Sequence, residues 1–306
     1  MTNHDHETNM HTEAKWHELQ TSRRELLSGE ALRGVGVEVF DVEKECACCM
    51  DERVGNRATL GGEEMGNRWN VAGSGILLPE ASWRARAVLA AKEAFRRGVT
   101  KISFHDGCGA AGLAVKQDLA QFTPDEKAGF EANSDSYGQK FAELAQSELN
   151  KLTGEHFEAV HVDRNEVQPF EYHTAIGATI DTTGEFNAYK LPSEHPLRYS
   201  FNIDTSSADT LKSNEEAKFK YYLNELQVAI KIATGHHGFG HKFSKEEPFA
   251  VVVVGESDEI IQRTEQQITA FLTANEPGAL EIIKFVSLVK PTKKSERAEQ
   301  EQRVNS

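Results

Sequence analysis

The chain has 306 residues, of which 39% are hydrophobic and 27% are charged, a balance typical of a soluble globular protein with a sizeable core. Its formal net charge of −14 disfavours nucleic acid and anionic membranes as partners, because both would repel such a surface. No apolar run reaches the roughly 18 residues of a membrane span, and the polar N-terminus lacks a secretory signal, so we expect a cytoplasmic protein. Four cysteines are too few for a disulfide framework, which favours reduced thiols, some of them bound to a metal.

Residues 1–24 are interpreted as a polar tail followed by the start of a helix. The tail carries His4, His6 and His11 with little to bury, which predicts disorder; metal binding by these histidines is the less favoured alternative. Apolar residues separated by charged ones then indicate a helix over residues 13–32.

Residues 25–192 are predicted to form one α/β domain. Its predicted elements are strands over residues 35–40, 43–49, 99–104 and 158–162, helices over residues 83–95 and 137–152, and a hairpin over residues 175–188. Two of these strands lead directly into cysteine-containing motifs. Because ligands in open α/β sheets gather at the carboxyl ends of the strands, these motifs are the candidates for a functional site.

The two motifs are Cys-x-Asp-x-Arg, which begins at Cys49, and His-x-x-Cys, which begins at His105. Cys49, His105 and Cys108 offer two thiolates and an imidazole, a ligand set that suits tetrahedral zinc. The fourth position can hold Asp51 or a water molecule, and an open water position distinguishes a catalytic zinc site from a structural one.

Asp51 and Arg53 lie two residues apart, so on an extended segment their side chains point the same way and can pair. The alternative to a catalytic site is a structural zinc site in which Cys46 or Cys48 supplies the fourth ligand. We interpret these two cysteines instead as small hydrophobic residues of the strand.

Two other features of the sequence are weaker candidates for sites. Gly107 to Gly112 match the dinucleotide-binding pattern G-x-G-x-x-G, but no acidic residue ends a second strand about 20 residues later, which disfavours nicotinamide binding. His236, His237 and His241 are interpreted as loop residues, with a proton shuttle or a second metal site as the alternative.

Both motifs resemble those of the β-class carbonic anhydrases, as does the segment Asn70-Val71-Ala72-Gly73 between them, although Trp69 departs from the pattern beside Arg68. The resemblance covers roughly residues 25 to 190. It implies a mostly parallel sheet flanked by helices, and Zn2+ held by Cys49, His105 and Cys108. It further implies that Asp51 pairs with Arg53 in an open state and can become a fourth ligand in a closed one.

The function that this resemblance implies is the reversible hydration of carbon dioxide to bicarbonate through a zinc-bound hydroxide, with Asp51 and Arg53 as the catalytic pair. Hydrolysis of carbonyl sulfide or carbon disulfide on the same zinc site is the enzymatic alternative. The non-enzymatic alternative is an assembly protein that binds zinc or bicarbonate without catalysis.

Residues 193–290 repeat the order of elements, with a strand over residues 199–203, a helix over 215–233 and a strand over 249–254. We interpret them as a degenerate second α/β copy, in which Asp204 stands near the Cys49 position and Glu256 near the His105 position. The alternative is that any α/β chain repeats helix and strand. We expect a homodimer or, if the second copy is real, a pseudo-dimeric single chain that can pair further. Residues 291–306 are expected to form a disordered tail.

Overall fold

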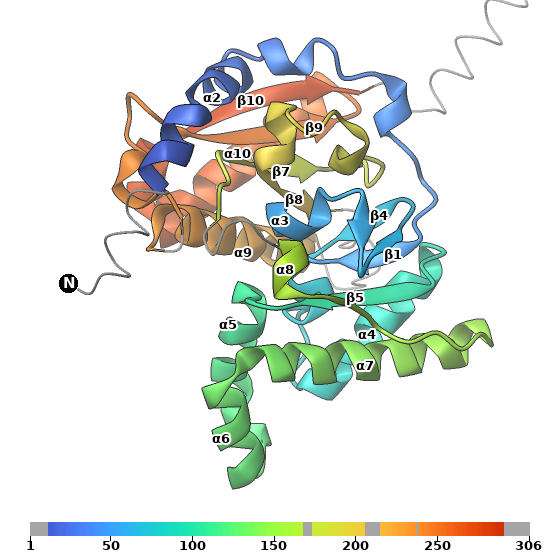
Figure 1. Ribbon diagram of the computed structural model, residues 1–306. Helices are drawn as coiled ribbons and strands as arrows, with labels where there is room; N and C mark the ends of the chain where they lie inside the picture. Colours follow the sequence, from blue (N-terminus) through green and yellow to red (C-terminus); the bar gives the residue numbers. More distant parts are fainter. Residues whose placement is uncertain (1–11, 168–172, 206–214, 237, 291–306) are drawn as a thin grey trace, which may run out of the picture.

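The computed structural model describes residues 12–167, 173–205, 215–236 and 238–290. Two four-stranded parallel sheets form the framework, in the orders β4-β1-β5-β6 and β10-β9-β7-β8, and helices flank both (Figure 1). The mixed α/β class with parallel strands is therefore confirmed. The predictions for His4, His6 and His11 and for residues 291–306 lie outside the described residues.

The first sheet lies in residues 41–167, called here the first half. Its strands are β1 (Cys46–Cys48), β4 (Arg68–Asn70), β5 (Lys101–His105) and β6 (Val160–Val162), and a short ribbon pairs β2 (Thr59–Leu60) with β3 (Glu63–Glu64). Its helices are α3 (Glu52–Gly55), α4 (Trp83–Arg96), α5 (Gly109–Asp118), α6 (Pro124–Ala132), α7 (Ser134–Thr153) and α8 (Arg164–Val167).

Small residues bring α4 close to α7. The buried stripe of α4 includes Ala87, Ala90, Ala91 and Ala94, spaced as one face of a helix requires, and α7 packs on both α4 and β5. Ser82 caps the start of α4, and Gly98, with φ of 73°, follows its end in the left-handed conformation that favours glycine.

The second sheet lies in residues 173–290, called here the second half. Its strands are β7 (Gly177–Asp181), β8 (Ser200–Asp204), β9 (Phe249–Gly255) and β10 (Ile283–Val289), and its helices are α9 (Glu215–Thr234) and α10 (Asp258–Asn275). Helix α2 (Gln20–Leu27), from the N-terminal part of the chain, packs against β9 and β10. The apolar run of β9 is buried along its whole length, as expected for an inner strand of a parallel sheet.

Short 3-10 helices occupy several connections. They are η1 (Glu30–Leu32), η2 (Val37–Val39), η3 (Ala72–Gly75), η4 (Leu119–Gln121), η5 (Ala188–Lys190), η6 (Pro196–Tyr199), η8 (Gly240–Lys242) and η9 (Pro277–Glu281).

Two predicted elements were wrong. Residues 35–40 form η2 rather than a strand, and only Phe40 makes an isolated bridge, to Phe186. The predicted hairpin over residues 175–188 is the single strand β7, because Asp181 accepts hydrogen bonds from the Thr183 and Phe186 amides and turns the chain out of the sheet. Since β7 pairs with β8 and β9, the change of sheet falls before residue 177, within the predicted 25–192 domain.

The position expected for Asp204 also needs correction. Asp204 ends β8, which lies at the edge of its sheet, whereas Cys49 follows β1, which lies between β4 and β5. The first strand of the second half along the chain is β7, which is an inner strand of its sheet and lies within the predicted 25–192 domain. The degenerate-copy hypothesis therefore requires a different correspondence of residues.

The two halves share one continuous hydrophobic core, and their edge strands β4 and β8 contact each other. Asn56 Nδ2, from the first half, donates to the carbonyls of Arg198 and Ser200 at 2.8 and 3.0 Å. Asn187 Oδ1, from the second half, accepts a hydrogen bond from the Arg68 amide at 2.9 Å. Each half thus uses a buried asparagine to bind the backbone of the other half's edge strand.

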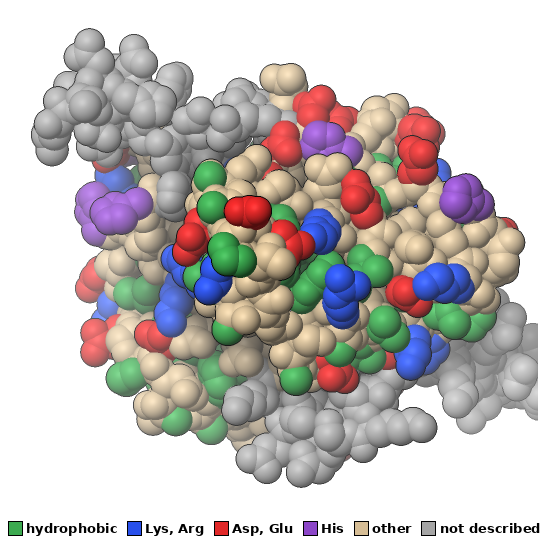
Figure 2. Space-filling model, turned by 90° about the horizontal axis from the view of Figure 1, so that it is seen from below, with side chains coloured by type: hydrophobic (Ala, Val, Ile, Leu, Met, Phe, Trp, Pro, Cys, Tyr) green, Lys and Arg blue, Asp and Glu red, His purple; other side chains and the backbone are tan. Residues whose placement is uncertain are grey.

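Charges of both signs are interspersed on the face of the molecule seen in Figure 2. Among the described residues, no helix combines the length and the apolar composition that crossing a membrane requires.

We expect Asn56→Ala and Asn187→Ala each to destabilise the protein by about 1–3 kcal/mol, because each leaves buried backbone groups without a partner. Urea unfolding would measure the change, with Asn275→Ala as the control, since that exposed side chain bonds only within α10. Two asparagine variants as stable as the control would contradict this account of the contact between the halves.

Candidate metal centre

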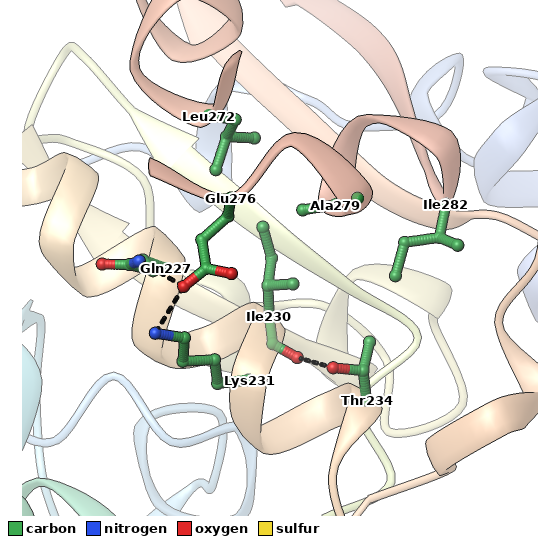
Figure 3. A pocket seen from close by; sticks show the side chains of 9 residues that line it. Gln227, Ile230, Lys231, Thr234, Leu272, Glu276, Ala279 and Ile282 are labelled. Atoms are coloured by element: carbon green, nitrogen blue, oxygen red, sulfur yellow. Dashed lines mark hydrogen bonds and ion pairs between the residues drawn. The ribbon is translucent and has the colours of Figure 1, made fainter. Parts of the chain in front are cut away.

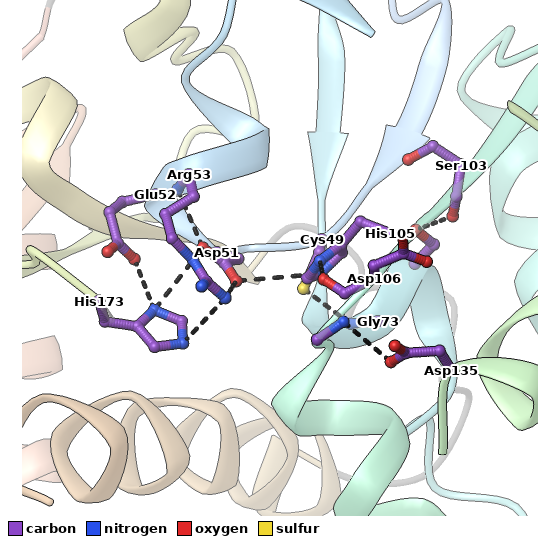
Figure 4. Close-up of polar contacts among 12 residues, drawn as sticks. Cys49, Asp51, Glu52, Arg53, Gly73, Ser103, His105, Asp106, Asp135 and His173 are labelled. Atoms are coloured by element: carbon purple, nitrogen blue, oxygen red, sulfur yellow. Dashed lines mark hydrogen bonds and ion pairs between the residues drawn. The ribbon is translucent and has the colours of Figure 1, made fainter. Parts of the chain in front are cut away.

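The candidate metal centre lies where β1 and β5 end. The two strands are parallel neighbours, with Ala47 paired to Ile102, so the residues that follow them emerge at the same edge of the sheet. There the donor atoms of Cys49, His105 and Cys108 all lie within 4.8 Å of one another, and all three residues are buried. Figure 4 shows Cys49 and His105 beside each other, with Asp51 and Arg53 next to them. The structure therefore brings together the three predicted ligands.

The donor set fits a metal ion. Tetrahedral zinc with ordinary bond lengths separates its sulfur and nitrogen donors by roughly 3.5–3.8 Å, so small side-chain shifts suffice. His105 Nδ1 lies 3.0 Å from the Asp106 carbonyl oxygen, to which it can donate, and this fixes the tautomer. His105 Nε2 is buried and has no hydrogen-bond partner among the described residues, so it is left available as a ligand atom.

Hydrogen bonds and burial shift the pKa values of the three groups. The hydrogen bond with Cys49 lowers the pKa of Cys108, and amides at the start of α5 add to this effect. The pKa of Cys49 is raised well above its usual value, first by its hydrogen bond with Cys108 and then by burial. Burial alone would lower the pKa of His105, but Cys49 and Asp51 raise it to about 9. Metal binding must therefore release protons from these groups.

Asp51 and Arg53 form a buried ion pair beside the three donors. Arg53 Nε and Nη2 bind the two carboxylate oxygens of Asp51 at 3.0 and 2.7 Å, and the Arg53 amide donates to Asp51 Oδ1 at 2.9 Å. Burial opposes ionisation, yet the Arg53 guanidinium, with a smaller contribution from His105, holds the pKa of Asp51 well below its usual range. Asp51 Oδ2 lies 3.9 Å from His105 Nε2, so the carboxylate borders the centre while Arg53 holds it.

His173 and Glu52 support this ion pair, and the sequence analysis did not single them out. Arg53 Nη2 lies 3.2 Å from His173 Nε2, and His173 Nδ1 lies 3.1 Å from Glu52 Oε2 (Figure 4). Since Arg53 can only donate, His173 Nε2 accepts and its Nδ1 carries the proton toward Glu52. His173 comes from the second half, directly before β7, so no spacing in the sequence linked it to the motif.

Asp51, Glu52 and His173 are close enough to be considered as a second metal cluster. The Arg53 guanidinium already neutralises Asp51, and the Thr174 amide occupies Glu52 Oε1 at 2.8 Å. We therefore interpret this cluster as support for Arg53 rather than as a cation site.

The remaining cysteines do not join the centre. Cys46 and Cys48 belong to a separate small hydrophobic cluster with Val54, Leu60 and other apolar residues, and Cys48 Sγ donates to Asn70 Oδ1. Alternation along β1 explains this, since Cys48 and Cys49 project to opposite sides.

The glycines after His105 serve the turn into α5. Gly107 has φ of 70°, and a Cβ on Gly109 would lie 3.2 Å from Ile232 of α9. This close approach accounts for the glycine-rich segment without a dinucleotide.

Helix α9 of the second half closes one side of the centre. Besides the contact at Gly109, its Glu225 accepts a hydrogen bond from the Ala72 amide at 2.7 Å. The opposite face of α9 lines a cavity of about 230 Å³, whose wall includes Ile230, Leu272 and Ile282 and whose rim carries the Lys231–Glu276 ion pair (Figure 3). No residue of the candidate metal centre lines that cavity.

Comparison of the chain with protein-family models, curated proteins and solved structures finds no significant match.

We expect Cys108→Ala to lose stoichiometric metal, because two donors at this site hold zinc far more weakly than three. Cys48→Ala is the matched control, since it removes a buried thiol next to Cys49 that faces the other cluster. Metal analysis by plasma mass spectrometry after dialysis would measure both. Full metal retention by Cys108→Ala, in a background that also lacks Cys46 and Cys48, would rule out the assigned ligands.

Proposed function

We propose that this chain is a zinc enzyme that reversibly hydrates carbon dioxide to bicarbonate, as its resemblance to the β-class carbonic anhydrases implies. The observation that carries the proposal is the convergence of Cys49, His105 and Cys108 beside a carboxylate that Arg53 holds away from direct coordination. Three protein donors with a fourth position left for water are the pattern of catalytic rather than structural zinc.

Zinc held by these donors would supply a nucleophile at neutral pH by lowering the pKa of water. The chain's own residues would orient that chemistry. Asp51, kept ionised by Arg53 and 3.9 Å from His105 Nε2, would accept a hydrogen bond from a group at the fourth position and so orient it. His173 holds Arg53, and the Gly73 amide donates to Cys49 Sγ at 3.2 Å, which moderates the negative charge of the thiolate.

We further infer that the second half is a degenerate copy of the first. If the four strands of each sheet are numbered as they occur along the chain, both sheets have the same spatial order: second, first, third, fourth. Ala47 of β1 pairs with Trp69 and Ile102, and Ala178 of β7 pairs with Phe201 and Val251. Aligning the two alanines matches Trp69-Asn70-Val71 with Phe201-Asn202-Ile203, and it matches Asn56 with Asn187.

This alignment supports an internal pseudo-twofold axis. Asn56 binds the backbone of Ser200, and Asn187 binds the backbone of Arg68, which is the reciprocal contact of a symmetric interface. The pseudo-dimer would then lie within one chain.

The same alignment accounts for a single metal centre. Ile180, Val254 and Ser257 stand where the first half has Cys49, His105 and Cys108. Two of the three substitutes carry no donor atom, so the second half would bind no zinc.

Stopped-flow measurement of carbon dioxide hydration, with zinc determined on the same sample, tests the proposal. Activity should track zinc content, vanish with a chelator and return with added zinc. A parallel assay with carbonyl sulfide separates the related hydrolysis, and a zinc-loaded protein inactive toward both substrates would overturn the proposal of an enzyme.

Arg53→Ala should reduce hydration by at least 10–100-fold while zinc stays bound, because Asp51 is released from its two side-chain bonds and can move onto the metal. Arg84→Ala, at an exposed arginine of the same half, is the control. Near-normal hydration by Arg53→Ala would show that the ion pair is structural only.

A further inference from the structure

The segment from Ala72 to Gly75 has an unusual backbone. Gly73, Ser74 and Gly75 have φ of 52°, 56° and 102°, and Ser74 is the only non-glycine residue with positive φ in the described part of the chain. Side chains disfavour a left-handed run of this kind, although the segment makes turn hydrogen bonds of its own, such as that from the Ser74 amide to the Val71 carbonyl at 3.0 Å. Contacts from outside the segment therefore help to hold it.

Two consecutive amides of this segment bind groups on different parts of the molecule. The Gly73 amide donates to Cys49 Sγ at 3.2 Å, and the Ala72 amide donates to Glu225 Oε1 at 2.7 Å. The two amides flank the Cα atom of Ala72, so only the two backbone dihedral angles of that residue separate them. Glu225 thus holds the peptide unit directly before the one whose N–H contacts Cys49 Sγ.

The burial of the Glu225 carboxyl group is energetically unfavourable. Only 1% of its surface is exposed, the Tyr221 hydroxyl donates to Oε1 at 2.8 Å, and Oε2 has no partner among the described residues. Burial, opposed by the Ala72 and Tyr221 hydrogen bonds and aided by Asp204, raises its pKa to about 7. An apolar side chain of similar size would fill this place at lower cost, so the carboxyl is explained by what it binds.

We propose that Glu225 is a positioning residue of the metal centre: through the Ala72 amide it holds the Gly73 N–H on Cys49 Sγ. The inference deepens the proposed function and assigns to α9 of the second half a direct part in the first half's site. A hydrogen bond to a thiolate weakens its donation to the metal. Loss of the bond should therefore make the metal less acidic and shift the pH midpoint of activity upward.

The test uses the full-length protein reconstituted with zinc or cobalt, and Glu225→Ala and Glu225→Met as variants. Metal affinity, measured by chelator competition, should fall roughly 10–100-fold, because Cys49 loses the N–H that positions its sulfur and favours its deprotonated form, and this loss outweighs the stronger donation of the freed thiolate. The sulfur-to-cobalt charge-transfer band should move to lower energy. Glu225→Gln keeps an oxygen that can accept the Ala72 N–H, so it should restore affinity and spectrum. Glu276→Ala is the control, because that carboxylate packs against the opposite face of α9.

The readouts separate this inference from the proposed function, because affinity and spectrum are measured without carbon dioxide. Circular dichroism would establish that each variant is folded. Should neither Glu225→Ala nor Glu225→Met fold, Tyr221→Phe tests the same contact with a smaller shift in the same direction. Wild-type affinity and an unshifted band in a folded variant without the carboxyl would overturn the inference. Loss of hydration by Glu225→Gln with an unchanged spectrum would also overturn it, in favour of proton acceptance by Glu225.

Discussion

The parallel pairing of β1 with β5 is the constraint on which the candidate site depends. Cys49 and His105 are far apart in the sequence, yet parallel neighbours end at the same edge, so both residues emerge there. Cys108 follows within one turn because it caps α5, whose first amides favour a thiolate. Neither strand exceeds five residues, so few hydrogen bonds join them. The hydrophobic core packed around the two strands must therefore help to hold their register.

The second half contributes to this site at two separate points. His173, which precedes β7, binds Arg53, and Glu225 of α9 binds the segment that contacts Cys49. Both side chains are buried, so separating the halves would break both hydrogen bonds and expose the site to water. A chain with one metal centre would therefore still need both of its sheets.

The sequence was sufficient where chemistry is local. The motifs at Cys49 and His105, the strand that precedes each and the α4 periodicity all follow from nearby residues. It was insufficient where a residue's partner lies in the other half: His173 and Glu225 have no recognisable spacing to the ligands. The turn at Asp181 was misread as a hairpin because turn signals do not reveal whether the next strand returns to the same edge.

Diffraction data collected at the zinc absorption edge on crystals grown with the metal would test the central claim most directly. We predict one anomalous peak per chain, about 2.3 Å from the sulfurs of Cys49 and Cys108 and about 2.0 Å from His105 Nε2, with Asp51 still bound to Arg53. No peak should lie beside Ile180. A peak coordinated by Cys46 or Cys48, or no peak at the end of β1 and β5, would contradict the account.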